Sequence, residues 1–366
     1  MPGFSDACVL ATFPLLGNWV IADVALASLR ESCASVRIVV DHDAKAAALA
    51  LSGRWKNRPV EVHVLENGLT GLLRLLSSDA SELVLVGSLS AAWVLDPGSP
   101  AALAAAAGGS VAKASLQRTP VELYGCRRDR LLAILEAAAP RLAKARRCRE
   151  LLFEGTLTGA IDLIEEIPGA LLFLNDPTDL HRRTLALAAH DPAALLPVAR
   201  MPEPAEPPLE ARIAERARVV SSWIAPGASV EGTVEGSVVF PGASVRRGAH
   251  VTNSVLMNGV VVGSGATVQN ALVFPHGIAE PAARSGSRAA ATIGDRCSVG
   301  RRSSAAVNAA YPEQIRDGLT VIGMGVDLPA GFKVEAGCLV GPGAVAADLR
   351  RRKVLRRGQS VPENGR

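Results

Sequence analysis

Two pairs of neighbouring arginines are the residues of this sequence that are best suited to bind an anion. They are Arg246–Arg247 and Arg301–Arg302. Each guanidinium group can donate two parallel hydrogen bonds to one phosphate or carboxylate, and two adjacent groups supply two positive charges. We therefore predict that these four arginines bind an anion such as a phosphorylated metabolite. The alternative is that each pair lies at an exposed corner of the fold and is simply solvated.

A third basic group lies near the C-terminus. It consists of Arg350, Arg351, Arg352, Lys353, Arg356 and Arg357. Such a run could bind an anion or a polyanion, but we interpret it as a solvated tail. The net charge of the whole chain is only +4. Composition therefore predicts no nucleic-acid partner.

These arginines lie in or beside a repeat, because small aliphatic residues recur at every sixth position in runs between Ile224 and Ala346. One run is Val239, Val245 and Val251. A period of six differs from the 3.6 of a helix and the two of a strand. It is typical of a left-handed parallel β-helix, in which each coil has three faces and each face directs one aliphatic residue inward. We expect loops to leave the coils at 275–292 and 308–319.

The N-terminal half alternates between strand-like and helix-like segments. The predicted strands are 7–10, 36–40, 60–65, 82–86, 111–115 and 121–124, and the predicted helices are 23–31 and 71–76. Alternation of this kind favours an α/β domain with a mostly parallel sheet and helices on both faces. The acidic residues Asp162, Glu165 and Glu166 are expected on the exposed side of a further helix.

The composition divides the chain into four parts. We expect an α/β domain at 1–196, a linker at 197–218, a β-helix at 219–348 and a basic tail at 349–366. The linker assignment rests on its prolines, which are Pro202, Pro204, Pro207 and Pro208.

Neither a membrane partner nor an exported protein is indicated by the sequence. It has no run of eighteen or more uncharged apolar residues, and no basic segment precedes an apolar one at the N-terminus. Its six cysteines are scattered, without a CxxC pair. We predict a cytoplasmic protein with reduced thiols.

Two segments resemble glucose-1-phosphate adenylyltransferases. The sequence of residues 253–273 is similar to the β-helix of that family. The sequence of residues 14–32 is similar to the segment that follows the family's nucleotide-binding loop. The matching residues in the second segment are Pro14, Gly17, Trp19, Ile21, Asp23, Ala25, Leu26 and Ser28. The resemblance implies a shortened Rossmann-like, GT-A-like nucleotidyltransferase domain followed by the β-helix. It also implies a reaction in which ATP and glucose 1-phosphate give ADP-glucose and diphosphate.

The sequence departs from that family at each position that the reaction requires. Residues 7–16 lack the glycines and the arginine of the phosphate-binding loop. Ser88 stands where a strand ends in a magnesium-binding Asp, Asn175 stands at the second magnesium carboxylate, and 118–126 lack the lysine that contacts the sugar phosphate. A neutral hydroxyl or amide is a weak ligand for Mg²⁺. We therefore predict no catalytic residue and no cofactor, with Mg²⁺ needed only if the family activity survives.

These departures lead us to expect a catalytically inactive member of the family, most similar to its non-catalytic subunit, which often carries Asn at the position of Asn175. Such a protein would be a regulatory or scaffolding subunit in bacterial glycogen and ADP-glucose synthesis. It would assemble with itself or with an active paralogue through the β-helix, since open coil ends need a cap or a neighbour.

Two other functions remain open from the sequence. The first is an active sugar-1-phosphate nucleotidyltransferase with a diverged site. The second is a hexapeptide-repeat acyltransferase, which would use His250 or His276 as a base and coenzyme A as the acyl carrier.

Overall fold

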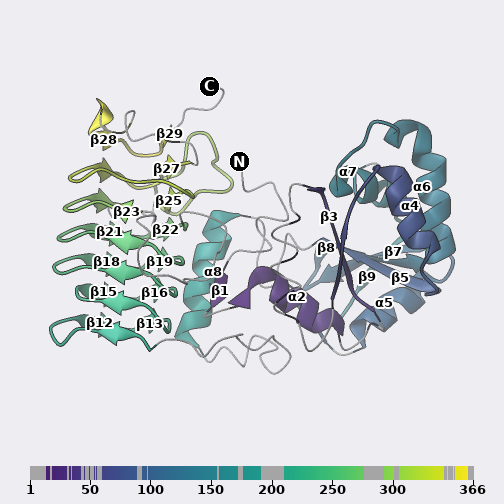
Figure 1. The fold of residues 1–366 in the computed structure, drawn as a ribbon, viewed down its shortest axis with the longest axis horizontal. Coiled ribbons are helices and arrows are strands. Elements are labelled where there is room, and N and C mark those ends of the chain that lie inside the picture. Colours follow the sequence, from purple (N-terminus) through teal and green to yellow (C-terminus); the bar gives the residue numbers. More distant parts are fainter. Residues whose placement is uncertain are drawn as a thin grey trace.

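The computed structural model places an α/β part and a stack of β-strand coils side by side, with helix α8 between them (Figure 1). It describes residues 14–16, 19–30, 33, 35–42, 45, 49, 53, 55, 60–88, 93–96, 98–154, 156–171, 176–190, 210–275, 292–300, 305–341, 344, 349 and 351–361. All statements of structure below refer to these residues.

The stack of coils is a three-sided parallel β-helix, and each side is one parallel sheet. The first sheet contains β11 (Arg212–Ile213), β14 (Ser229–Val230), β17 (Ser244–Val245), β20 (Val261–Val262) and β23 (Thr292–Ile293). The second contains β12 (Arg218–Val220), β15 (Thr233–Glu235), β18 (His250–Thr252), β21 (Thr267–Gln269), β24 (Ser298–Val299), β26 (Lys333–Val334) and β28 (Val354–Leu355). The third contains β13 (Trp223–Ile224), β16 (Val238–Val239), β19 (Val255–Leu256), β22 (Ala271–Val273), β25 (Thr320–Ile322), β27 (Leu339–Val340) and β29 (Ser360–Val361).

The residues that recur every sixth position form the interior of this β-helix. On the first sheet, Val230 pairs in register with Val245 and Val245 with Val262, so the three side chains stack on one another. All three are fully buried in one continuous cluster. The sequence prediction of inward-pointing aliphatic ladders is therefore confirmed.

The β-helix is longer than the expected range of 219–348. Its first strand lies within the expected linker, at Arg212, and its last strand ends at Val361 within the expected tail. The six-residue spacing in fact continues through Leu349, Leu355 and Val361, which are buried in the same core. The residues between these positions are mostly arginine and lysine. A run of positive charge indicates a solvated tail, so the six-residue spacing is hard to recognise there.

A row of serines joins successive coils at the corner between the second and third sheets. The hydroxyl groups of Ser222, Ser237 and Ser254 each donate to a carbonyl group two residues earlier in their own coil. Each also accepts an N–H group from the next coil, namely that of Ser237, Ser254 and Ala271 respectively. The row ends at Ala271, which has no hydroxyl group.

Residues 305–319 form the expected loop between β24 and β25, and Asn308 fixes this loop to the last coils. Its side chain is fully buried. The Asn308 Nδ2 atom donates to the carbonyl oxygen of Gly337 at 2.9 Å, and Oδ1 accepts from Ser360 Oγ at 3.1 Å. The same Oδ1 accepts from the N–H groups of Ala310 and Tyr311. Most of the other expected loop, at 275–292, lies outside the described residues.

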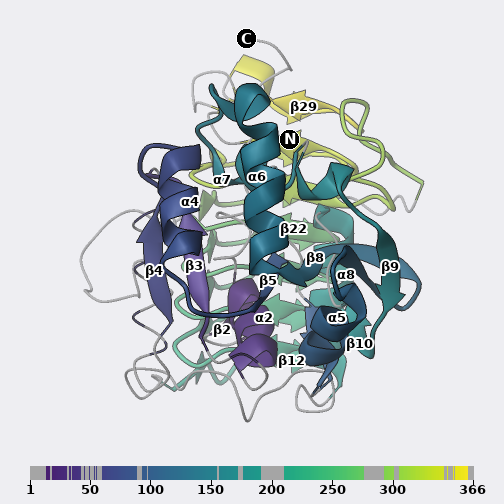
Figure 2. The same cartoon turned by 90° about the vertical axis from the view of Figure 1, so that its right-hand side faces the viewer.

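The α/β part is built from short sheets with helices packed against them, as Figure 2 shows with the coils behind. Its strands are β1 (Pro14–Leu16), β2 (Trp19–Val20), β3 (Arg37–Val40), β4 (Glu61–Val64), β5 (Leu83–Gly87), β6 (Trp93–Leu95), β7 (Val111–Leu116), β8 (Thr119–Arg127), β9 (Leu163–Glu166) and β10 (Gly169–Leu171). Its helices are α2 (Ile21–Arg30), α4 (Leu69–Ser77), α5 (Ser99–Ala107), α6 (Arg128–Leu142), α7 (Cys148–Leu152) and the 3₁₀ helix η2 (Leu157–Gly159).

The expectation of a mostly parallel sheet is wrong for the described strands. Only β3–β4 and β7–β9 pair in parallel, whereas β1–β2, β5–β8, β7–β8 and β6–β10 are antiparallel. The hairpin of β7 and β8 turns at Gln117 and Arg118, which both have positive φ angles. Tight hairpin turns of this kind usually contain Gly or Asn, so Gln117 and Arg118 do not indicate a turn. The acidic segment expected on a helix is also a strand, β9.

Helix α8 (Pro177–Ala189) covers the outer side of the third sheet. Leu180 and Leu187 of this helix pack with Val238, Val255 and Leu272, which point away from the β-helix interior. The neighbouring residue on each strand points inward, so the third sheet is buried on both of its sides. The helix therefore connects the α/β part to the β-helix by apolar packing.

Candidate functional site

Ser88 follows β5 directly, at the strand end where the resembling family has a metal-binding carboxylate. The residue is buried, with 7% of its surface exposed, and its N–H group donates to the carbonyl oxygen of Glu122 at 2.9 Å. The Glu122 carboxylate lies against Arg149, whose two terminal nitrogens approach its oxygens to 3.0 and 3.4 Å. Arg149 also donates from Nε to Glu154 at 3.1 Å. Glu122 and Glu154 thus share one guanidinium group.

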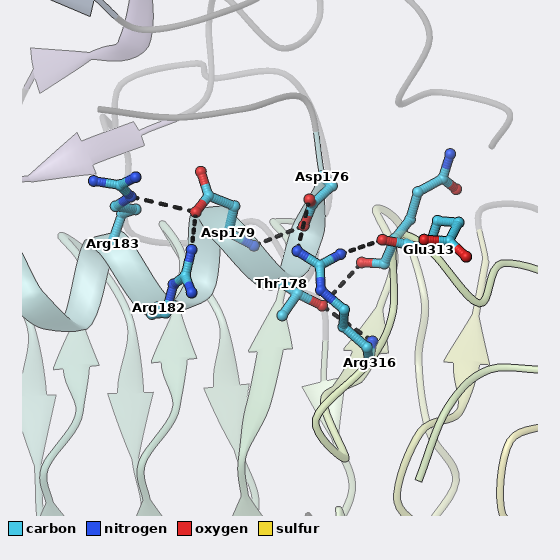
Figure 3. Close-up of polar contacts among 8 residues, drawn as sticks. Asp176, Thr178, Asp179, Arg182, Arg183, Glu313 and Arg316 are labelled. Atoms are coloured by element: carbon cyan, nitrogen blue, oxygen red, sulfur yellow. Dashed lines mark hydrogen bonds and ion pairs between the residues drawn. The ribbon is translucent and has the colours of Figure 1, made fainter. Parts of the chain in front are cut away.

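Asn175, the second predicted site residue, lies outside the described residues, but Asp176 next to it is described. Asp176 is the N-cap of α8, because its Oδ1 atom accepts the N–H group of Asp179 at 2.7 Å. Its Oδ2 atom accepts from the Arg316 guanidinium at 3.2 Å. Figure 3 shows both contacts, which occupy the two oxygens of this carboxylate.

The first turn of α8 is joined to the loop at 305–319 by a second set of bonds. Both the N–H group and the hydroxyl group of Thr178 donate to the carbonyl oxygen of Gln314, at 3.3 and 2.9 Å. The Thr178 hydroxyl oxygen in turn accepts the N–H group of Arg316 at 3.1 Å. We call Asp176, Thr178, Gln314 and Arg316 the α8 junction (Figure 3).

Asp179 lies one residue further along the helix and binds two arginines. Its carboxylate is 1% exposed and accepts from Arg182 at 2.6 Å and from Arg183 at 3.3 Å. The Arg182 side chain is 65% exposed and the Arg183 side chain is 40% exposed. Together with Arg316, which contacts Asp176, three guanidinium groups bind the two carboxylates at the start of this helix.

His181 of α8 is buried against the β-helix. Its Nε2 atom lies 2.9 Å from the carbonyl oxygen of Asn253, and a carbonyl group can only accept, so Nε2 carries the proton. Burial lowers the pKa of His181 to about 4. The imidazole is therefore neutral at pH 7. The Asn253 side chain donates to Asn270, whose amide donates to the carbonyl oxygen of Asp317, so a chain of amides leads to the loop that holds Arg316.

Sequence reasoning missed the α8 junction. The order Asp-Pro-Thr-Asp is a signal for the start of a helix, with Asp as N-cap and Pro in the first turn. The partner of Asp176, however, is 140 residues away in the sequence. No local pattern indicates that contact.

The structure places only half of the predicted arginine site. Arg246 and Arg247 lie at an exposed corner after β17, and within the described part of the chain neither guanidinium group forms an ion pair. Arg301 and Arg302 lie outside the described residues, so the proximity of the two pairs stays a prediction. His250 is exposed at the start of β18, and His276 also lies outside the described residues.

The described residues contain neither a cluster of metal ligands nor a membrane-spanning helix. No group of three or more His, Cys, Asp and Glu side chains is arranged there to hold a metal ion. No helix in these ranges has the length and apolarity needed to cross a bilayer. No disulfide bond joins the described cysteines, and burial raises the pKa of the Cys126 and Cys338 thiols to about 11.

The site and fold define the C-terminal half as a hexapeptide-repeat domain. Residues 208–289 match the family described as "GlmU-like, C-terminal hexapeptide". A stretch of 70 residues is 43% identical to a glucose-1-phosphate adenylyltransferase of Bacillus cereus (strain Q1). It is 41% identical to enzymes of the same name from Bacillus thuringiensis (strain Al Hakam) and Bacillus anthracis.

The chain is thus related to glucose-1-phosphate adenylyltransferases, but over a limited length. Each match covers 19% of this chain and only 18% of the relative.

Proposed function

We propose that this protein is a catalytically inactive relative of the glucose-1-phosphate adenylyltransferases, most similar to their non-catalytic subunit, that acts as a regulatory or scaffolding subunit in the synthesis of ADP-glucose. The observation that carries the proposal is Ser88. It places a neutral hydroxyl at the end of β5, where the resemblance calls for a carboxylate that holds Mg²⁺.

The described carboxylates that adjoin Ser88 and Asn175 do not fit a magnesium ion. Glu122, whose carbonyl oxygen accepts the Ser88 N–H group, has its carboxylate bound by Arg149. Asp176, which follows Asn175 in the chain, uses its two oxygens for Asp179 and Arg316. Transfer of an adenylyl group builds negative charge that must be neutralised, and each lost electrostatic contact typically costs on the order of 10²-fold in rate. We therefore derive no catalytic step from this arrangement.

The role that we assign to the β-helix is assembly. We infer a left-handed coil next to a shortened, GT-A-like nucleotidyltransferase domain, and a cytoplasmic subunit that binds a second copy of itself or an active paralogue. The exposed outer sides of the first and second sheets support this assignment. Ser229, Ser244 and Thr267, for example, are small and only partly buried, which allows close approach of a flat partner surface.

The decisive experiment measures catalysis and assembly together. The purified protein is incubated with ATP, Mg²⁺ and glucose 1-phosphate, alone and with an active glucose-1-phosphate adenylyltransferase. We expect no ADP-glucose from the protein alone, and co-elution with the active enzyme together with a change in its kcat/KM. Turnover by the protein alone that is lost on deletion of residues 1–20 would refute the proposal, because it would show that the N-terminal segment still binds nucleotide.

A regulatory role also calls for an effector site, and we propose the arginine pairs Arg246–Arg247 and Arg301–Arg302 as that site. The exposure of Arg246 and Arg247 supports access of a phosphorylated metabolite. Thermal unfolding with fructose 1,6-bisphosphate, 3-phosphoglycerate and AMP tests this point. A ligand-induced rise in Tm should disappear when all four arginines are changed to Gln, and a rise that persists would exclude these residues.

A further inference from the structure

The last coil of the β-helix carries a concentrated positive charge on a fixed backbone. We call Arg351, Arg352, Lys353, Arg356 and Arg357 the basic coil. All five residues are exposed. Between and beside them, Leu349, Leu355 and Val361 are buried in the β-helix core with 0%, 0% and 3% of their surface exposed. The alternation of buried aliphatic and exposed cationic residues holds the charges on the outside.

The backbone of the basic coil is held by the coil before it. Strand β28 pairs with β26 and β29 pairs with β27, in parallel register. The N–H group of Glu335 donates to the carbonyl oxygen of Leu355 at 3.0 Å, and that of Arg357 donates to Oε2 of Glu335 at 2.9 Å. These bonds fix the positions from which the arginine side chains extend.

The charge of this coil exceeds that of the whole protein. The five residues carry +5, whereas the entire chain has a net charge of +4. Six residue steps separate Arg351 from Arg357, so they lie within about 20 Å of each other. Lys333, which is exposed on the adjacent coil and pairs with Val354, adds a sixth positive charge, and the exposed Glu335 carboxylate on that coil offsets one of the six. Like charges so close together repel, and an anionic partner relieves that repulsion.

We propose that the basic coil is a docking surface for an extended acidic segment of a partner protein. Four of its five cations are arginines, which pair with carboxylates through two parallel hydrogen bonds. Residues 349–361 contain no aromatic side chain on which nucleic-acid bases could stack.

Backbone geometry favours an extended partner. Among the described strands, β28 and β29 each have a hydrogen-bonded neighbour on one side only, and the other side of each is where an extended partner segment would pair.

The proposal is tested with the full-length protein and a fluorescein-labelled peptide of ten glutamates. Fluorescence anisotropy at 50 mM salt should show binding that weakens as salt is added, because part of the attraction is between screened charges. The triple variant Arg351→Gln, Arg356→Gln and Arg357→Gln should bind the peptide at least tenfold more weakly. Its Tm should stay within a few degrees of the wild type, since only exposed side chains change.

The matched control is the triple variant Arg212→Gln, Arg216→Gln and Arg218→Gln, which removes three charges from exposed positions on the first coil of the same β-helix. It should bind the peptide as tightly as the wild type. Equal weakening by both variants would overturn the proposal, because it would show a response to net charge alone. An absence of peptide binding, or tighter binding of a single-stranded ten-nucleotide DNA than of the peptide, would also overturn it. This test is independent of adenylyltransferase relatives, so its failure leaves the proposed function untouched.

Discussion

At the scale of single residues, His181 shows how burial selects one protonation state. The imidazole lies between α8 and the β-helix, and its Nε2–H group donates to the carbonyl oxygen of Asn253. Protonation would place a positive charge in an apolar interface, which is why the pKa is lowered to about 4. The unfolded chain has no such restriction and accepts a proton near pH 6.5.

The first prediction is that acid destabilises the protein through His181. Below pH 6.5 the unfolded state binds a proton that the folded state excludes, so the free energy of unfolding falls as pH falls. The contribution is about 1.4 kcal/mol per pH unit down to about pH 4, below which both states are protonated. Urea unfolding at pH 7 and pH 5 should show a smaller loss for His181→Gln than for the wild type. His250→Gln, at an exposed position, should lose as much as the wild type.

The second prediction concerns Asn308, whose buried amide joins the loop at 305–319 to two coils. Asn308→Ala leaves the N–H groups of Ala310 and Tyr311 without their acceptor and should cost about 3 kcal/mol in the free energy of unfolding. Ser360→Ala removes one of the same bonds and should cost about 1 kcal/mol. If denaturant unfolding gave the same loss in the free energy of unfolding for Asn308→Ala and Ser360→Ala, the Asn308 amide would not be the centre of this hydrogen-bond network.

At the scale of elements, the α8 junction is the polar end of a mostly apolar contact. Leu180 and Leu187 hold the helix on the third sheet, while Asp176 and Thr178 fix its first turn to the loop. Apolar contacts have little directional preference, whereas hydrogen bonds have strict geometry. The junction therefore sets the position of α8 along the coils.

The third prediction is that Thr178→Val loosens this junction without disturbing the fold. Valine has a similar shape and keeps the backbone N–H bond to Gln314, but its side chain cannot donate to the carbonyl oxygen of Gln314 or accept the N–H group of Arg316. We expect a loss of about 1 to 2 kcal/mol and faster hydrogen exchange at 308–319. Thr158→Val, which removes a hydroxyl bonded only within the α/β part, should leave exchange at 308–319 unchanged.

The same elements show how far the sequence alone reaches. Inward positions of the β-helix are predictable because each coil repeats a local six-residue pattern, and Val230, Val245 and Val262 conform to it. The last coil was missed because arginines surround Leu355. The β7–β8 hairpin was missed because Gln117 and Arg118 are unusual in its turn.

The candidate site is less accessible to sequence reasoning than the fold. Ser88 is recognised from the residues next to it in the sequence. The replacement of the family's carboxylate by serine at this position is therefore visible without a structure. The contact of Asp176 with Arg316 joins residues that are 140 positions apart, and it depends on how the α/β part sits on the coils. A prediction of that contact needs the tertiary structure.

At the scale of the whole molecule, the α/β part and the β-helix share a hydrophobic cluster. Val24 of α2 and Leu187 of α8 belong to the same buried cluster as Leu272 and Leu339 of the coils. Removal of either part exposes apolar surface on the other. We therefore expect the two parts to unfold together rather than as independent domains.

The fourth prediction tests this coupling with Leu187→Ala. A cavity at this position should cost about 2 to 5 kcal/mol and should accelerate hydrogen exchange in β16, β19 and β22, which lie beneath α8. Leu131→Ala creates a similar cavity inside the α/β part, where Leu131 is fully buried. If the two variants gave the same exchange pattern in those strands, the shared cluster would not couple the parts.

The serine row at the corner of the β-helix limits how the chain can change in length. Ser237 lies 15 positions after Ser222, and both Ser254 after Ser237 and Ala271 after Ser254 lie 17 positions on. An insertion or deletion of one residue within a coil would move a serine away from the N–H group above it and turn the inward valines outward. Removal of the 17 residues 241–257 would instead place Ser237 directly beneath Ala271 and keep both patterns. Changes of length inside this domain are thus limited to whole coils or to a shortened corner such as the one between β14 and β15, and other insertions must leave as loops.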